Sequence, residues 1–192
     1  MQLLHFKITK SVDINTFIAF WSQLYSYSNE AIYKKNISKK MFDAESVQEL
    51  FIWKNGMRLS DLKQKSLNNK IISKLEAINY LKSKDEFELD LFNYEFNSLS
   101  AVWKIFLLHI IQPKKFPIYD QHIHRAFLFI HKEDFSKISN DTISNKEKEK
   151  FYFERYLPFI KSQKINDIKQ LDEAFFAFGQ FLNTRDYKNL FE

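Results

Sequence analysis

The sequence predicts an all-α protein, built either as one helical domain or as two tightly packed lobes. The chain has 192 residues but only 2 glycines and 3 prolines, so it offers few positions for turns or breaks. Apolar side chains recur at three- and four-residue spacing over most of its length, which is the period of a helix. No segment shows the two-residue alternation of a β-strand. We expect residues 1–192 to form a single compact helical unit.

Local signals divide the chain into helices joined by short connections. Gly56 is a favourable end for the helix before it, and Ser60 is a natural N-cap for the helix after it. Pro158 should kink or split its helix, because proline has no amide hydrogen. Residues 28–40 and 132–145 carry the fewest structure signals, so we expect loops there. The expected helices cover residues 13–26, 44–54, 60–67, 68–83, 98–112, 120–132, 145–163 and 167–184.

The last expected helix carries two neighbouring stripes. The first is apolar and predicts a core face, made by Ile168, Leu171, Phe175, Phe178 and Leu182. The second contains Asp172, Phe176 and Gly179. Because glycine has no side chain, either a ligand or another helix can approach the backbone at Gly179 closely.

Composition narrows the functional classes. Lys and Arg number 29 against 24 Asp and Glu, which gives a net charge of +5 and permits a polyanionic partner. The absence of cysteine excludes disulfides and a cysteine-bound iron–sulfur cluster. No window approaches the ~18 consecutive apolar residues that span a bilayer, and residues 1–7 lack the pattern of a signal peptide. We therefore expect a soluble, cytoplasmic protein with no membrane partner.

One lysine lies within an apolar helix. Between Ala101 and Ile111 the polar side chains are Lys104 and His109, so this helix should be buried on nearly all sides. Burial and a position near the helix start both disfavour the charged form of Lys104. A neutral amine can attack a carbonyl-type carbon and form a Schiff base. The alternative is that the ammonium of Lys104 extends along its stem to water.

An aspartate opens the following helix. Asp120 precedes an apolar face, so N-capping alone would explain it. The connection over residues 112–117 is short enough to fold the two helices into a hairpin. We expect that hairpin to bring Asp120 back towards Lys104, with the catalytic region at residues 98–132.

Two segments resemble the helix-hairpin-helix DNA glycosylases, the family that includes endonuclease III and the 8-oxoguanine glycosylases. Residues 99–104, LSAVWK, are similar to the hairpin pattern h-G-h-G-x-K, which supplies a Schiff-base lysine in that family. Residues 119–125, YDQHIHR, resemble the segment V-D-T-H-V-x-R, which places an aspartate at the head of a helix. The resemblance implies two packed helical lobes with a cleft, and catalytic roles for Lys104 and Asp120.

The final helix adds a weaker resemblance, to the archaeal 8-oxoguanine glycosylases. Residues 171–179, LDEAFFAFG, are similar to a helix in which an aspartate and an aromatic residue four positions later line the base pocket. This resemblance implies pocket roles for Asp172 and Phe176. Trp53 is a further candidate, since pockets for an extruded base use aromatic faces. A tryptophan near a helix end also serves ordinary packing.

DNA contacts are expected around the hairpin. Ser100 and Val102 stand where the family has glycines, which let backbone N–H groups approach a phosphate. Ser100 can instead cap its helix and leave those N–H groups facing outward. Lys114 and Lys115 lie in the loop between the two catalytic segments, where they would meet a phosphate beside an extruded nucleotide. Arg125 is a further candidate DNA contact.

The spacing of the histidines favours chemistry without a metal or cofactor. His122 and His124 are close in sequence, but two positions apart on a helix their side chains point about 200° away from each other. There is no H-E-x-x-H motif. We therefore interpret both histidines as surface or hydrogen-bonding residues.

The sequence thus predicts a monomeric DNA glycosylase that flips and excises a damaged or modified base. A Schiff base would also make strand cleavage, and so lyase activity, feasible. The resemblance implies repair of an oxidised purine, with excision of a modified phage base as a variant. The missing hairpin glycines favour one alternative, a DNA-binding or protein-interaction module that kept the fold and lost catalysis. Another is an enzyme that acts on RNA or on a free nucleoside.

Overall fold

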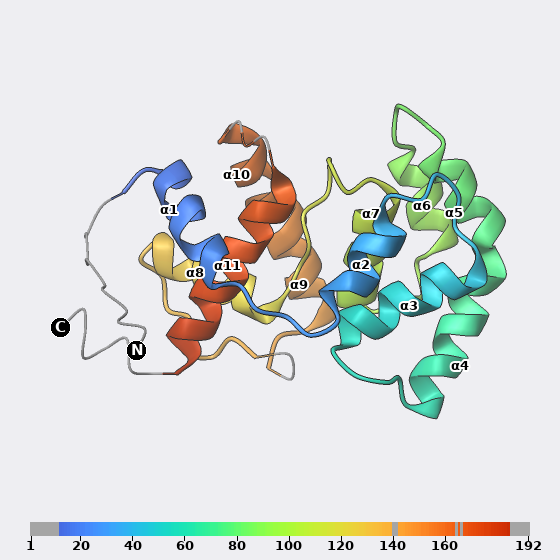
Figure 1. Ribbon diagram of the computed structural model, residues 1–192, viewed down its shortest axis with the longest axis horizontal. Helices are drawn as coiled ribbons and strands as arrows, with labels where there is room; N and C mark the ends of the chain where they lie inside the picture. Colours follow the sequence, from blue (N-terminus) through green and yellow to red (C-terminus); the bar gives the residue numbers. More distant parts are fainter. Residues whose placement is uncertain (1–11, 140–141, 164, 166, 185–192) are drawn as a thin grey trace.

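The computed structural model describes residues 12–139, 142–163, 165 and 167–184, and every regular element within these ranges is helical. The prediction of an all-α fold is confirmed. Figure 1 shows two groups of helices. The first group contains α1 (Ile14–Trp21), α8 (Gln121–Ile130), α10 (Leu157–Ser162) and α11 (Ile168–Asn183). The second contains α2 (Glu30–Ile37), α3 (Ala44–Asn55), α4 (Asp61–Lys70), α5 (Leu75–Lys82), α6 (Leu89–Glu95) and α7 (Ala101–Ile111).

The two groups share one hydrophobic core. A connected cluster of buried side chains includes Leu50 of α3, Ile105 of α7 and Phe175 of α11, all with no exposed surface. The helix α9 (Asn145–Phe151) packs against α7 and joins the groups at the centre of the molecule (Figure 1). Burial of this shared apolar surface holds the two groups together as one body.

Helices α8 and α11 meet at a point where no side chain fits. A Cβ atom added to Gly179 would lie 1.9 Å from the backbone oxygen of His122. The close approach expected at Gly179 is therefore to another helix. This contact fixes the first turn of α8, and with it the residue that precedes the helix, Asp120.

Several predicted helix ends are confirmed, because local side chains satisfy the free backbone groups there. The helix α3 ends at Gly56, which adopts a positive φ of 73°. The side chain of Ser60 accepts a hydrogen bond from the N–H of Lys63 and so caps α4. The side chain of Asp120 accepts one from the N–H of His122 and caps α8.

Two helices were not predicted. The helix α2 lies in the expected loop over residues 28–40, and its buried polar side chains bind partners far along the chain. The Tyr33 hydroxyl donates to Nε2 of His109 at 2.7 Å, and Nδ2 of Asn36 donates to Glu49 at 2.6 Å. Helix α6 buries Phe92, although its N-cap residue makes no side-chain capping bond. Neither helix has the long apolar period that reveals a helix in a sequence.

The helix expected over residues 145–163 is split, as Pro158 predicted. After α9, the five residues Tyr152–Tyr156 form a wider π-helical turn, and α10 starts at Leu157. Pro158 occupies the first turn of α10, where its missing N–H leaves the preceding turn without one helical hydrogen bond.

Other boundaries moved by a few residues. The helix expected over 13–26 ends at Trp21 and continues as a 3₁₀ turn, Ser22–Leu24. Within its described part, the expected loop over residues 132–145 holds no helix before Asn145, and residues 140–141 lie outside that part. Residues 1–7, considered for a signal peptide, also lie outside the described residues. In the ranges that the structure describes, no helix is both long enough and apolar enough to cross a bilayer.

Candidate functional site

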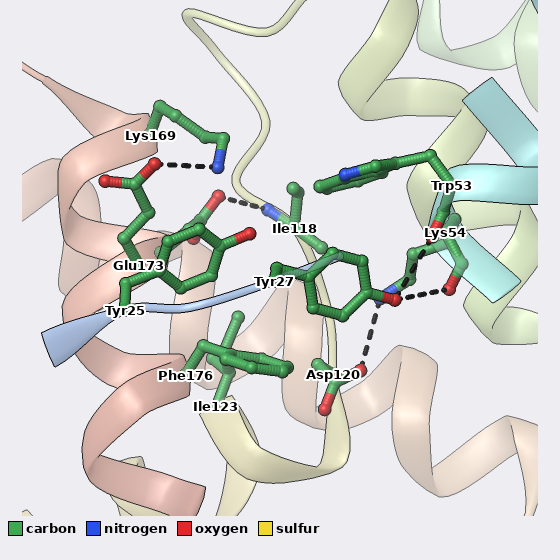
Figure 2. Close-up of a pocket in the computed structure, with 11 residues that line it drawn as sticks. Tyr25, Tyr27, Trp53, Lys54, Ile118, Asp120, Ile123, Lys169, Glu173 and Phe176 are labelled. Atoms are coloured by element: carbon green, nitrogen blue, oxygen red, sulfur yellow. Dashed lines mark hydrogen bonds and ion pairs between the residues drawn. The ribbon is translucent and has the colours of Figure 1, made fainter. Parts of the chain in front are cut away.

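A pocket opens where the two groups of helices meet (Figure 2). Its volume is about 350 Å³, counting the part that is open to solvent. The segment between α1 and α2, the last turn of α3, the segment before α8, the start of α8 and one face of α11 all contribute. The lining residues are Tyr25, Tyr27, Trp53, Lys54, Ile118, Asp120, Ile123, Lys169, Asp172, Glu173 and Phe176.

Aromatic rings form the walls of the pocket. Tyr27 packs edge-on against Trp53, with ring centroids 5.2 Å apart, and against Phe176 at 5.6 Å. Tyr25 contacts Phe176 at 5.7 Å. Burial raises the pKa of the Tyr27 hydroxyl to about 12, so this group stays protonated and donates to the backbone oxygen of Trp53 at 3.1 Å. The Tyr27 ring therefore adds a neutral face to a pocket that is also lined by charged side chains.

A lysine and an aspartate meet at one side of the pocket. Nζ of Lys54 lies 3.3 Å from Oδ2 of Asp120 and donates to the backbone oxygen of Tyr119 at 2.9 Å. The other carboxylate oxygen of Asp120 accepts from the N–H of His122 at 2.9 Å. The Lys54 side chain is only 9% exposed. Asp120 is thus both a helix cap and the partner of a pocket amine.

A second lysine is held among carboxylates and rings. Nζ of Lys169 lies 2.9 Å from Oε1 of Glu173. It lies 3.0 Å from Oε1 of Glu30, although this second pair lacks hydrogen-bond geometry. The same ammonium sits 4.7 Å from the ring centre of Tyr25. Oε2 of Glu30 accepts from the Tyr25 hydroxyl at 3.0 Å and from Nε1 of Trp53 at 3.2 Å. This cluster holds two pocket rings in place.

Asp172 lines the pocket, but both of its carboxylate oxygens are already engaged. Oδ2 accepts from the N–H of Ile118 at 2.7 Å, and Oδ1 accepts from the hydroxyl of Tyr156 at 3.2 Å. The residue is 3% exposed, and burial raises the pKa of its carboxyl group to about 8. Asp172 therefore anchors the segment that carries Asp120, which is a structural task besides the expected contact with a base.

The structure does not bring Lys104 to Asp120. Lys104 lies on the face of α7 that packs against α9, where its Nζ is 3.4 Å from Oε2 of Glu149. It is not among the residues that line the pocket, and the amine beside Asp120 belongs to Lys54. In this structure Lys104 is directed at α9 and Lys54 at Asp120, so the expected approach of Lys104 to Asp120 is not seen.

The expected DNA contacts at the hairpin differ in exposure. Ser100 is exposed but makes no side-chain capping bond. The N–H of Ala101 donates to Oδ1 of Asn145 at 3.1 Å, so this group of the helix start faces α9 rather than solvent. Lys114 and Lys115 are both exposed, and Nζ of Lys115 donates to the backbone oxygen of residue 85.

Arg125 is buried, which argues against the DNA contact expected of it. The residue is 6% exposed. Its guanidinium donates to the backbone oxygens of Ile138 at 2.7 Å and Gly179 at 3.3 Å, and to Nδ1 of His122 at 2.9 Å. A guanidinium bound on three sides inside the fold joins α8 to α11 and has no free path to a phosphate.

The histidines of α8 take part in packing. Nδ1 of His124 lies 3.1 Å from the Tyr119 hydroxyl, and its ring stacks on Phe151 at 3.6 Å. Burial lowers the pKa of His124 to about 4. Over the part of the chain that the structure describes, no group of three His, Asp or Glu side chains is arranged to hold a metal ion.

Comparison of the chain with models of known families, with curated proteins and with solved structures gives no match. The residues of the pocket are therefore the basis for inferring a function. Four of the sequence candidates, Trp53, Asp120, Asp172 and Phe176, line this one pocket. Lys54 was missed, and its only signal was its place next to Trp53 at a helix end.

Proposed function

We propose that the protein is a DNA N-glycosylase that draws a damaged or modified base out of the duplex and cleaves its bond to the sugar. The observation that carries the proposal is an aromatic-walled pocket with an amine and a carboxylate side by side at its edge. The motif resemblance around Asp120 supports the same reaction.

The walls suit a flat ring. Enzymes that act on a base hold the extruded ring between aromatic or apolar faces, and stacking of this kind contributes about 1–3 kcal/mol per base. Tyr27 and Phe176, which are both partly exposed, supply such faces (Figure 2).

The carboxylate suits the bond that would break. Cleavage at C1′ of a sugar develops positive charge on the ring, as in glycoside hydrolysis. A negative group fixed beside that carbon stabilises the charge. Two hydrogen-bonding partners, the N–H of His122 and the ammonium of Lys54, fix the carboxylate of Asp120. It would therefore need little rearrangement to act.

DNA is the partner that fits the overall charge. The chain carries a net charge of +5, and phosphate contacts supply most of the affinity that does not depend on sequence. The exposed lysines Lys114 and Lys115 lie in the connection between α7 and α8, which also leads to Asp120. We propose that this loop contacts a phosphate near the extruded base. An oxidised purine is the first substrate to test, and a modified phage base the second.

Release of free base from a panel of lesion-bearing and modified duplexes tests the proposal. Asp120→Asn is the matched variant, because asparagine also caps helices. We expect this variant to keep the fold and DNA affinity but to excise bases about 10²–10⁴ times more slowly. Salt-sensitive DNA binding by the wild-type protein without release of any base would instead identify a binding module. Cleavage of free nucleosides would identify an enzyme that acts on nucleosides instead of on DNA.

A further inference from the structure

We propose that Lys54 of α3, and not Lys104 of the hairpin, is the amine that attacks C1′. This inference rests on the proposed glycosylase function. It assigns a catalytic task to a residue outside both segments that carry the family resemblance.

The position of Lys54 suits a nucleophile. A nucleophile must be held next to the reacting carbon, and the flipped nucleotide would place that carbon at the pocket edge beside Asp120. Nζ of Lys54 lies 3.3 Å from Oδ2 of Asp120, and both residues line the pocket. Lys104 is paired at 3.4 Å with Glu149 on α9. The two amines therefore serve different ion pairs, and only the Lys54 pair opens into the pocket (Figure 2).

Lys54 is also held in place. The helix α3 ends at Gly56, two residues later, and the Tyr27 hydroxyl donates to the backbone oxygen of Trp53 at 3.1 Å. The amine is further tied to the backbone oxygen of Tyr119 at 2.9 Å. The Tyr27 ring, which is partly exposed, is thereby held next to the helical turn that carries the amine. A base stacked on Tyr27 would have its sugar presented towards Lys54.

The reaction balances with the groups present. The Lys54 ammonium passes one proton to Asp120, and the free amine forms a bond to C1′. The bond from C1′ to the base breaks, and the base keeps the electron pair and takes the proton from Asp120. A second amine proton moves to the ring oxygen as the bond between C1′ and O4′ opens. The products are the free base, a 4′ hydroxyl group and an iminium ion between Lys54 and C1′, which still carries one proton and one positive charge.

Reductive trapping locates the amine without any mutation. Wild-type protein is incubated with sodium borohydride and a duplex that contains either an abasic site or a lesion that the protein excises. The cross-linked protein is then digested with trypsin and mapped by mass spectrometry. We expect the reduced sugar on Lys54, with loss of tryptic cleavage there. An adduct on Lys104 would overturn the proposal and restore the hairpin lysine.

Paired variants give a second measurement. Lys54→Arg keeps a positive charge beside Asp120 but cannot form a Schiff base, so we expect trapping to fall at least 100-fold while DNA binding persists. Lys104→Arg, the matched control, keeps the charge beside Glu149 and should trap at the wild-type level. Equal trapping by both variants would refute the assignment to Lys54.

The two proposals fail in different ways. If the wild-type protein releases a base but borohydride never cross-links it to DNA, the glycosylase function stands and Lys54 is not a nucleophile. If borohydride cross-links Lys54 to abasic DNA but the protein releases no base from any lesion, the glycosylase function is refuted. Lys54 would then be the amine of an enzyme that acts only on abasic sites.

Discussion

Replacement of Gly179 by alanine should destabilise the protein, although the same change stabilises most helices. Alanine is favoured over glycine in a helix interior by about 1 kcal/mol. At Gly179, however, the added Cβ would lie 1.9 Å from the backbone oxygen of His122, against a practical minimum of 3.0 Å. The colliding atom belongs to a backbone, so no side chain can turn away to relieve the contact.

The size of the effect follows from the displacement required. Helix α8 would have to move about 1 Å away from α11 at the point where the two helices touch. Overpacking of this kind costs about 1–3 kcal/mol, and a backbone contact should lie at the upper end of that range. After the helix-propensity gain, we expect a net loss of roughly 1–2 kcal/mol. In a chain of this length that corresponds to a fall in Tm of about 2–8 °C.

Urea unfolding followed by circular dichroism measures this loss. Gln180→Ala, at the next and exposed position of α11, is the matched control and should stay within about 0.5 kcal/mol of the wild type. Because His122 follows Asp120 by two residues, Gly179→Ala should also disturb the Lys54 pair and slow base release. A Gly179→Ala protein more stable than the wild type by about 1 kcal/mol would refute the close packing of α8 on α11.

Two further predictions concern pH and salt. The fold raises the pKa of Asp172 from 3.8 to about 8, so the native state binds more protons than the unfolded state between those values, and this group's contribution to stability falls as the pH rises from about 4 to 8. Between those pH values the free energy of unfolding of the wild type should fall by up to about 6 kcal/mol more than that of Asp172→Asn, which has no carboxyl group there. Equal pH slopes for the variant and the wild type in urea titrations would contradict the raised pKa of Asp172. For DNA binding, four or five phosphate contacts predict a log–log salt slope of roughly −4. Replacing Lys114 and Lys115 by Glu should make that slope shallower by up to about 2, whereas an unchanged slope in titrations at several salt concentrations would exclude the loop from the interface.

Features that depend on neighbouring residues were predictable from the sequence. Gly56, Ser60 and Asp120 act on the backbone within three residues, and each lies at the helix end expected for it. Helix α2 was missed because its stability comes from distant partners. Tyr33 reaches His109, 76 residues away, and no local pattern announces such a contact.

The candidate site shows the same division. Asp120 and Phe176 lie in segments with recognisable patterns, and the structure places both in one pocket. Lys54 has no such pattern, because a lysine in the last turn of a helix looks like ordinary solvated surface. It enters the site only through the packing of α3 beside the segment before α8. The resemblance to the hairpin motif points to Lys104, but the direction of a side chain around a buried helix depends on which neighbours surround it.

The pairing of the first described helix with the last has a consequence for how the protein is made. Phe17 of α1 packs on Phe175 and Phe178 of α11, with ring centroids 5.4 and 5.3 Å apart. A ribosome that adds about 5–20 residues per second completes α1 many seconds before α11. The α2–α7 group is synthesised in that interval, while α1 waits for its partner. The pocket wall on α11 is thus the last part to form, and an unfinished chain would carry Lys54 and Asp120 without the surface that holds a base.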